Sequence, residues 1–445
     1  MNSLPSAIEP TIFQNEINEP IHIIDELSST MRATDKNGDT SDFYGRLILR
    51  WLPTPRVFIE GKFDFNKPPL FLEIGQECEA ELHEEGLKTN IKLSEKDSTV
   101  NSKGKGWVRF WPLEDIADVY PHEQLNQIKF SVPNLPFYVG KPITTPNINR
   151  QIGYSGRLEL QIDDWIIVLD QISNHKTIKE ELKEYGGYAV TYGGEIKKIN
   201  DEQFTCAEGK KVLKKLSELL TFVSGRKTHP IIPVGITSKG KEKYIELALP
   251  LIDRWEMGAG TFVDTNKPIT IESLAPSFFN LIDNEPWKSN IPQLLYWYTF
   301  ANRNVQGAGT DGSIVIAVAA LEQLAWLVLG ESYKRNELQR NLRKTFEELQ
   351  LPNEIPDHLE DLKHFAKQKD WHGGSSKVLA EFRNEIVHPD RQGGSSGNIN
   401  FEGLSLALWY METAILSLCN YEGPYRNRTK IGGCVGDTEY FKLSK

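Results

Sequence analysis

The segment Glu381–Asp390, with the sequence EFRNEIVHPD, gathers side chains that could cleave a phosphodiester bond. In a helix, Asn384 and His388 are four residues apart and share one face, and Arg383 directly precedes Asn384. An arginine can hold phosphate oxygens, and a histidine can accept or donate a proton near neutral pH. Attack by a ribose 2′-hydroxyl needs only such groups and no metal. The segment therefore predicts a candidate site for RNA cleavage.

A structural interpretation competes with this one. Pro389 cannot continue a helix, so His388 is expected in the last helical turn, where a charged imidazole would interact favourably with the helix dipole. Arg383 would then be a surface arginine. Glu322 is a second candidate, because a carboxylate in an apolar helix is costly without a partner. It would pair with Arg383 or His388, or lie on a solvent-exposed stripe beside Gln323.

The C-terminal part of the chain has the residue pattern of a helical bundle. Apolar residues recur at helical spacing, and short loops join the segments, as in an all-α bundle. Gly/Ser patches at Gly373–Ser376 and Gly393–Gly397 are interpreted as mobile loops on either side of one helix. The expected helices are Ile291–Asn302, Ser313–Leu329, Arg335–Leu349, Pro356–Lys367, Lys377–Val387 and Phe401–Cys419.

The first 270 or so residues are rich in strand-like segments between turn signals. The strongest is a hairpin over Gly156–Ile172, with a turn at Asp163-Asp164. One helix is expected over Gly209–Val223 and is ended by Gly225. Its lysines would lie on the solvent side of a helix packed on a sheet, or contact RNA. The other expected strands are Gly45–Trp51, Val57–Phe63, Cys78–His83, Gly106–Trp111 and Gln127–Val132.

Three stretches resemble one known family. Arg383-Asn384-x3-His388 resembles the R-x4-6-H motif of the HEPN superfamily (higher eukaryotes and prokaryotes nucleotide-binding). Met411–Arg428 is similar to the closing helix and G-x-Y-x-x-R tail of ApeA-like HEPN proteins, and Val318–Leu324 to their early helix. The N-terminal region resembles that of ApeA-type proteins in its β-rich character and in the leucine-rich helix at Val212–Val223.

The resemblance implies a homodimeric ribonuclease associated with anti-phage defence, in which the arginine and histidine of two protomers face one cleft. Carried over, Arg383 would bind and activate the scissile phosphate, His388 would be the acid or base, and Asn384 would orient them. Glu322 would stand for an acidic residue of the early helix. We expect an α+β multidomain fold: residues 1–280 as a β-rich region that senses an unknown trigger, and residues 285–445 as an all-α HEPN bundle.

Composition narrows the class of protein. The net charge of −10 argues against an electrostatic grip on nucleic acid by the whole surface, so an RNA substrate would need a local basic patch. Four scattered cysteines without a CxxC pair favour a reducing cytosol. The polar N-terminus has no secretory signal, and the apolar run Ile314–Leu329 is shorter than a membrane span. We expect a cytoplasmic protein without membrane contact, metal or cofactor.

Other motifs carry less weight. Gly393–Gly397 formally matches G-x-S-x-G, but a nucleophile elbow needs a strand before it and a helix after it. His358, His364 and His372 lack metal-site spacing, and surface positions are favoured over a place near the site. Arg426, Arg428 and Lys430 would form a basic tail that touches RNA or is simply solvated.

A different class of function stays open beside the ribonuclease. The helical domain would then be a catalytically silent dimerisation or interaction module, and the β-rich region would bind a ligand or nucleic acid. The acidic net charge favours this alternative, whereas the intact set of Arg383, Asn384 and His388 favours the enzyme.

Overall fold

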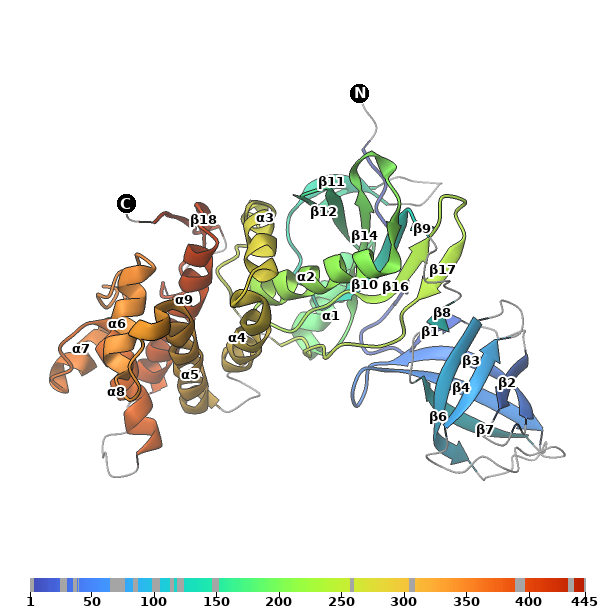
Figure 1. Cartoon of the computed structure of the whole chain (residues 1–445), viewed down its shortest axis with the longest axis horizontal. Helices are drawn as coiled ribbons and strands as arrows, with labels where there is room; N and C mark the ends of the chain where they lie inside the picture. Colours follow the sequence, from blue (N-terminus) through green and yellow to red (C-terminus); the bar gives the residue numbers. More distant parts are fainter. Residues whose placement is uncertain are drawn as a thin grey trace.

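The chain has a mixed α+β architecture, with a β-rich N-terminal half and a helical C-terminal half (Figure 1). The computed structural model describes residues 4–24, 30–34, 38, 40–64, 77–82, 87–97, 105–112, 116–117, 124–145, 152–256, 260–303, 309–388, 397–430 and 436–443. The expected α+β class is confirmed in this form.

The first sheet is a closed antiparallel ring. Its strand order is β1-β3-β2-β5-β6-β7-β4, and an additional pairing of β3 with β4 joins the two sides. Closure leaves few backbone groups unpaired at an edge. Four expected strands overlap β3, β4, β5 and β7. The bounds are β1 Ile21–Ile24, β2 Thr30–Thr34, β3 Thr40–Arg50, β4 Arg56–Asp64, β5 Glu77–Leu82, β6 Leu87–Asp97 and β7 Lys105–Pro112.

The second sheet is antiparallel and has the order β11-β12-β13-β14-β10-β16-β17-β8. The expected hairpin is confirmed, because β12 pairs with β13 and the turn holds Asp163 at a φ of 52°. A short pair, β9 (Gln124–Leu125) and β15 (Phe204–Thr205), lies beside it. The bounds are β8 Ile116–Ala117, β10 Gln127–Pro133, β11 Lys141–Thr144, β12 Gly153–Ile162, β13 Trp165–Gln171, β14 Val190–Lys198, β16 Ile231–Ile236 and β17 Glu242–Ile245.

Helix α2 (Cys206–Ser224) packs on this sheet as its leucine spacing predicts. The Thr205 hydroxyl and the Glu208 carboxylate form a capping box at its start. Gly225 ends it at a φ of 65°, where a Cβ atom would lie 2.4 Å from the side chain of Asn302. Helix α1 (His175–Tyr185) was not expected, because only Ile178 and Leu182 of its polar sequence are buried.

The helical half contains the six expected helices, and a further helix precedes them. Helix α3 (Ile269–Asp283) begins before residue 285, so helical structure starts earlier than the sequence analysis expected. A short hairpin of β18 (Gly423–Tyr425) and β19 (Glu439–Phe441) follows the last helix. The other bounds are α4 Trp287–Asn302, α5 Gly309–Leu329, α6 Leu338–Glu348, α7 Glu360–Gln368, α8 Ser375–Val387 and α9 Gly397–Leu418.

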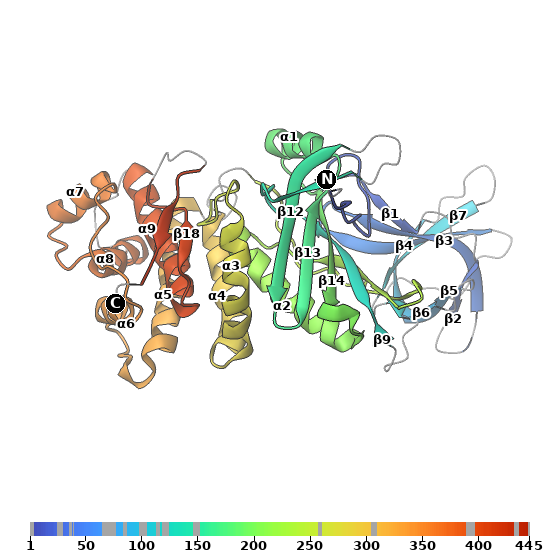
Figure 2. The same ribbon diagram turned by 90° about the horizontal axis from the view of Figure 1, so that it is seen from above.

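One hydrophobic core runs from the second sheet, called the central sheet below, into the helices. The same cluster of buried side chains includes Phe130 of β10, Leu216 of α2, Phe278 of α3 and Tyr410 of α9. Figure 2 shows α3 and α4 standing beside α2, between the sheet and the remaining helices. This continuous core ties the position of the later helices to the central sheet.

Helix α5 is the most apolar element of the helical half. The stretch Gly309–Ser332 is long and apolar enough to cross a membrane by length and composition, and half of its most apolar window is buried within the fold. The helix is longer than the apolar run Ile314–Leu329 that the sequence marks. It contacts α4, α6, α8 and α9, so it is a core helix of the bundle.

Candidate active site at the end of helix α8

The start of α8 is fixed by a side chain from the preceding loop. Asn353 accepts a hydrogen bond from the Ser376 backbone N–H at 3.0 Å and donates one to the Gly373 carbonyl at 3.0 Å. Gly374 has a φ of 76°, and a Cβ there would lie 2.1 Å from the Asn353 carbonyl oxygen, so a glycine is required. Ser375 and Ser376 are buried. The interpretation of Gly373–Ser376 as a mobile loop is therefore wrong.

One face of α8 is anchored in the core by aromatic packing. The Phe382 ring lies edge-on to Phe365 and Trp371, with centroid distances of 5.9 and 5.7 Å. Gly403 of α9 lets the two helices approach, because a Cβ at this position would be 3.2 Å from the Phe382 ring. This packing leaves the next residue, Arg383, on a partly exposed face.

The last turn of α8 brings the arginine and the asparagine of the motif into contact. Arg383 Nη1 donates a hydrogen bond to Asn384 Oδ1 at 3.3 Å. The backbone N–H of His388 donates to the Asn384 carbonyl at 3.0 Å and closes the helix. The His388 side chain is exposed to solvent. His388 is not in the last helical turn, as the sequence analysis expected, but is the extended residue directly after α8, with a φ of −112°. It lies next to residues 389–396, which fall outside the described ranges.

Arg383 differs from the other charged residues of its helix. Lys377 forms an ion pair with Glu381 at 2.7 Å, and Glu385 forms one with Lys369 at 2.8 Å. Arg383 has no ion pair with any carboxylate in the described ranges. A guanidinium without a carboxylate partner keeps its donors available for phosphate oxygens. The arrangement is suited to holding a phosphodiester beside an exposed imidazole.

Glu322 has a different partner from the expected ones. Its carboxylate accepts a hydrogen bond from the Tyr333 hydroxyl at 3.1 Å, and neither Arg383 nor His388 contacts it in the described structure. Burial and the nearby Glu322 carboxylate raise the pKa of Tyr333. Glu322 is partly buried on α5, and α5 packs against α8. The residue is thus on a neighbouring helix but held by its own short-range partner.

The remaining histidines of this region lie at the surface, as expected. His372 has a side chain that is 79% exposed, and His364 and His358 are exposed as well. His358 Nε2 lies 2.6 Å from the Thr429 hydroxyl. In the described ranges, no three His, Cys, Asp or Glu side chains come together as metal ligands would. Of the G-x-S-x-G match, only Gly397 is described, and it begins α9.

A second polar constellation, which the sequence analysis missed, is buried where the C-terminal tail meets α9. Arg428 Nη2 donates to Glu412 Oε1 at 2.6 Å, and the Tyr298 hydroxyl donates to the same oxygen at 2.6 Å. Arg428 also donates to Asn302 Oδ1 at 3.0 Å and to the Gly260 carbonyl. The side chains of Arg428 and Glu412 are 12% and 1% exposed. We call these four side chains the buried arginine cluster.

The buried arginine cluster connects the helical half to the segments that follow α2 and the central sheet. Asn302 Nδ2 donates to the Gly225 carbonyl at 2.9 Å, directly after α2. Burial alone lowers the pKa of Arg428, but the Glu412 carboxylate raises it, and the net effect is an increase. Lys430 is paired with Glu439. Arg428 is therefore not part of a solvated tail, because its donors are used within the fold.

The comparisons with known proteins match the same divisions of the chain. Residues 121–258 match the family model of the YopA central domain, and residues 284–440 match that of the YopA C-terminal domain. The chain is also 27% identical over 452 residues to the SPbeta prophage-derived uncharacterized protein YopA of Bacillus subtilis (strain 168), covering 98% of this chain and 97% of that protein. No solved structure matches the chain.

These matches define what the chain resembles as a whole. The first matched range contains the second sheet, except for β8, together with α1 and α2, and the other contains α4 to α9. They carry neither the HEPN nor the ApeA description, so the HEPN resemblance rests on the residues quoted for it. Over nearly its full length, the chain is similar to the YopA protein of a Bacillus subtilis prophage, whose description names no activity.

Proposed function

We propose that the helical half is a metal-independent endoribonuclease of the HEPN type, with its site at the end of α8. The observation that supports this best is the state of Arg383. Its guanidinium is partly exposed, is held by the Asn384 amide at 3.3 Å and has no carboxylate partner in the described ranges. An arginine in this state retains the capacity to bind an anion, and an exposed His388 lies five residues further along the chain.

The proposed reaction uses the ribose as its own nucleophile. Arg383 binds the non-bridging oxygens of the scissile phosphate and stabilises the charge that develops on them. His388 accepts the proton of the 2′-hydroxyl or delivers one to the departing 5′-oxygen. The 2′-oxygen forms a bond to phosphorus while the bond to the 5′-oxygen breaks. The products carry a 2′,3′-cyclic phosphate and a 5′-hydroxyl.

A homodimer is part of this proposal. Facing copies of the site would provide two histidines, one to accept a proton and one to donate it. The helical half exposes apolar side chains that suit contact with a second copy: Trp326 of α5 is 54% exposed, and Val387, next to His388, is 38% exposed. Partly exposed Val315 and Ala319 lie on the same face of α5 as Trp326.

The biological role that we propose follows from the same resemblance. The ribonuclease would act in the cytoplasm in anti-phage or stress defence, and the β-rich half would sense the trigger. The Bacillus subtilis relative is prophage-derived. The buried arginine cluster contacts Gly225 and Gly260 of the central part, which provides a physical connection between a sensing region and the nuclease.

In a second candidate function, the β-rich region binds a ligand or nucleic acid. The helical half is then a catalytically silent interaction module. The observation in its favour is a groove lined by lysines between α2 and the α3–α4 turn. RNA cleavage distinguishes this candidate function from the ribonuclease. Only the ribonuclease shortens RNA.

The test is cleavage of RNA by the full-length chain with EDTA present, beside a 2′-deoxy oligonucleotide of the same sequence. We expect cleavage of the RNA alone, with cyclic-phosphate ends, and loss of cleavage in His388→Ala. Cleavage of the 2′-deoxy strand would contradict the proposed nucleophile. Undiminished cleavage by His388→Ala would remove this site from the mechanism.

A further inference from the structure

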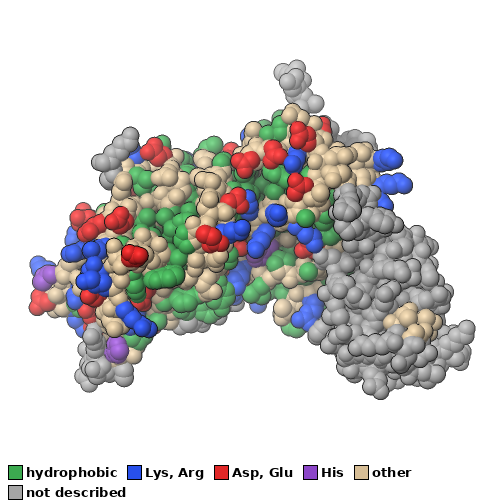
Figure 3. Space-filling model, in the orientation of Figure 1, with side chains coloured by type: hydrophobic (Ala, Val, Ile, Leu, Met, Phe, Trp, Pro, Cys, Tyr) green, Lys and Arg blue, Asp and Glu red, His purple; other side chains and the backbone are tan. Residues whose placement is uncertain are grey.

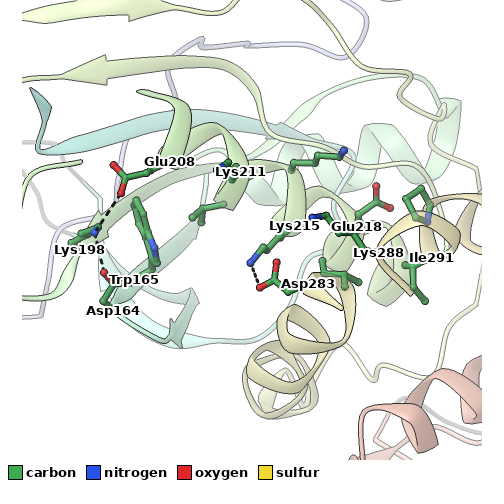
Figure 4. Close-up of a pocket in the computed structure, with 14 residues that line it drawn as sticks. Asp164, Trp165, Lys198, Glu208, Lys211, Lys215, Glu218, Asp283, Lys288 and Ile291 are labelled. Atoms are coloured by element: carbon green, nitrogen blue, oxygen red, sulfur yellow. Dashed lines mark hydrogen bonds and ion pairs between the residues drawn. The ribbon is translucent and has the colours of Figure 1, made fainter. Parts of the chain in front are cut away.

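A groove of about 580 Å³ lies where the central sheet meets the first helices of the C-terminal half. Its walls are the turn of the β12–β13 hairpin, the exposed side of α2, the end of α3 and the start of α4. Figure 4 shows side chains from all of these elements around the same space. Ligand pockets of about 300–1,000 Å³ are typical for small molecules and are frequent at junctions between domains.

Lysines from three elements line this groove. Lys198 comes from β14, Lys211, Lys214 and Lys215 come from α2, and Lys288 comes from α4. Figure 3 shows Lys and Arg side chains gathered on this face between the central sheet and the helices. Such a concentration is unexpected in a chain with a net charge of −10. Lysines on separate elements can surround one anion, whereas a row on one helix usually only keeps that helix in solvent.

Three of the four acidic residues of the groove form ion pairs with two of its lysines. Lys198 is paired with Asp164 at 3.0 Å and approaches Glu208 at 4.0 Å. Lys215 is paired with Asp283. Lys211 and Lys288 have no ion pair with any described residue. Lys214 has no ion pair with a described residue either, although it lies near the Glu218 carboxyl, so three ammonium groups of the lining are not paired with a described carboxylate.

The fourth acidic residue of the groove, Glu218, is partly buried on α2. Burial raises the pKa of the Glu218 carboxyl, and the nearby Lys214 lowers it in part. A shielded setting strengthens the attraction between a bound anion and the surrounding lysines. An anion bound beside this partly buried wall would be attracted more strongly by the lysines than an anion on an open surface.

The rest of the lining is apolar and includes one aromatic wall. Trp165 is partly exposed at one end of the groove, and Phe204 packs against its edge with a centroid distance of 4.8 Å. The Lys198 ammonium lies 5.4 Å from the centre of the indole. Val212, Ile282 and Ile291 supply the apolar floor. A ligand that fits both parts carries negative charge and a flat ring.

We propose that this groove binds a nucleotide-sized ligand, with its phosphates at Lys211 and Lys288 and its base against Trp165 and the apolar floor. The proposal goes beyond the ribonuclease and does not depend on it. A ligand held in this way contacts the central sheet through Trp165, α2 through Lys211 and α4 through Lys288. Its binding stabilises the junction between the two matched regions by mass action.

The experiment measures binding to the full-length chain by isothermal titration calorimetry. The probes are adenosine diphosphate, inorganic pyrophosphate, adenosine and a short oligouridylate. We expect adenosine diphosphate and pyrophosphate to bind and adenosine not to bind. The double variant Lys211→Ala/Lys288→Ala should weaken both phosphate probes by about tenfold or more, since charge-assisted hydrogen bonds are lost. Both lysines lack ion pairs in the described structure, so its melting temperature should match that of the wild type.

Two further variants separate the parts of the site. Lys239→Ala/Lys241→Ala removes the same charge from the exposed turn between β16 and β17 and should leave affinity unchanged. Trp165→Leu should weaken adenosine diphosphate but not pyrophosphate. Absence of binding by adenosine diphosphate, binding that survives Lys211→Ala/Lys288→Ala, or adenosine bound as tightly as its diphosphate would overturn the proposal. Binding of the oligouridylate alone would overturn it as well.

Discussion

Two arginines of the helical half have opposite surroundings. Arg428 is buried, and its donors are taken up by Glu412, Asn302 and the Gly260 carbonyl. Arg383 is partly exposed, and its described contact is the Asn384 amide. A buried cation needs a full set of partners, because an unpaired charge in the interior is costly. The difference indicates that Arg428 stabilises the fold, whereas Arg383 has donors that no described carboxylate occupies.

The largest effect should come from breaking the buried arginine cluster. Glu412→Ala leaves Arg428 buried without its carboxylate and should lower the free energy of unfolding by about 3–5 kcal/mol. Chemical denaturation of the full-length chain measures this. Glu347→Ala is the control, since that carboxylate is 62% exposed and its pair with Arg343 contributes little. Equal stability of both variants would show that the cluster does not support the fold.

A half-buried histidine, His229, which has no carboxylate partner among the described residues, should make stability depend on pH. Burial, helped by the nearby Lys227, lowers the pKa of His229 to about 4. Between that pKa and about 6.5, the unfolded chain binds the proton that the folded chain does not. Stability should therefore fall by about 2–3 kcal/mol as the pH falls through this range. His229→Gln, which cannot titrate, should reduce this slope in unfolding midpoints. An unchanged slope would contradict the burial of a neutral imidazole.

A smaller loss should follow from removing one donor of the buried arginine cluster. Tyr298→Phe removes the hydroxyl that donates to Glu412 Oε1 at 2.6 Å and keeps the ring in the core. We expect a loss of about 1–2 kcal/mol, because hydrogen bonds to charged groups exceed neutral ones. Thermal unfolding is sufficient to detect it. A variant as stable as the wild type would mean that Arg428 alone satisfies the carboxylate.

The smallest effect on stability is expected at Arg383, which is partly exposed at the end of α8. Arg383→Ala should change the free energy of unfolding by no more than about 0.5 kcal/mol, as is usual for surface substitutions. The same denaturation experiment measures it. A loss of several kcal/mol would place Arg383 with Arg428 among the structural arginines and would contradict the comparison.

Local patterns were sufficient to predict much of the fold. The alternation of Leu158, Leu160 and Ile162 predicted the hairpin, and the leucine spacing of α2 with Gly225 predicted that helix and its end. Helix α3 was missed because Pro276 interrupts a sequence with otherwise helical spacing. The expected boundary near residue 285 came too late for the same reason.

Long-range partners were not visible in the sequence. Arg428 was interpreted as part of a basic tail because its carboxylate, Glu412, lies within an apolar helix sixteen residues earlier. The Gly/Ser patch at Gly373–Ser376 suggested mobility, yet Asn353 binds it from a separate loop. For the candidate site, helical spacing correctly predicted the backbone hydrogen bond from His388 to Asn384 but not the extended conformation of His388. It could not show that Glu322 is hydrogen-bonded to Tyr333.

The most direct test of the central claim combines activity and stability in the same preparations. RNA cleavage with EDTA present would be measured for the wild type, Arg383→Ala and His388→Ala, with surface controls Arg343→Ala and His372→Ala. We expect Arg383→Ala and His388→Ala to lose cleavage while their unfolding midpoints stay at the wild-type value, and we expect both controls to keep cleavage. Cleavage retained by Arg383→Ala and His388→Ala would contradict it.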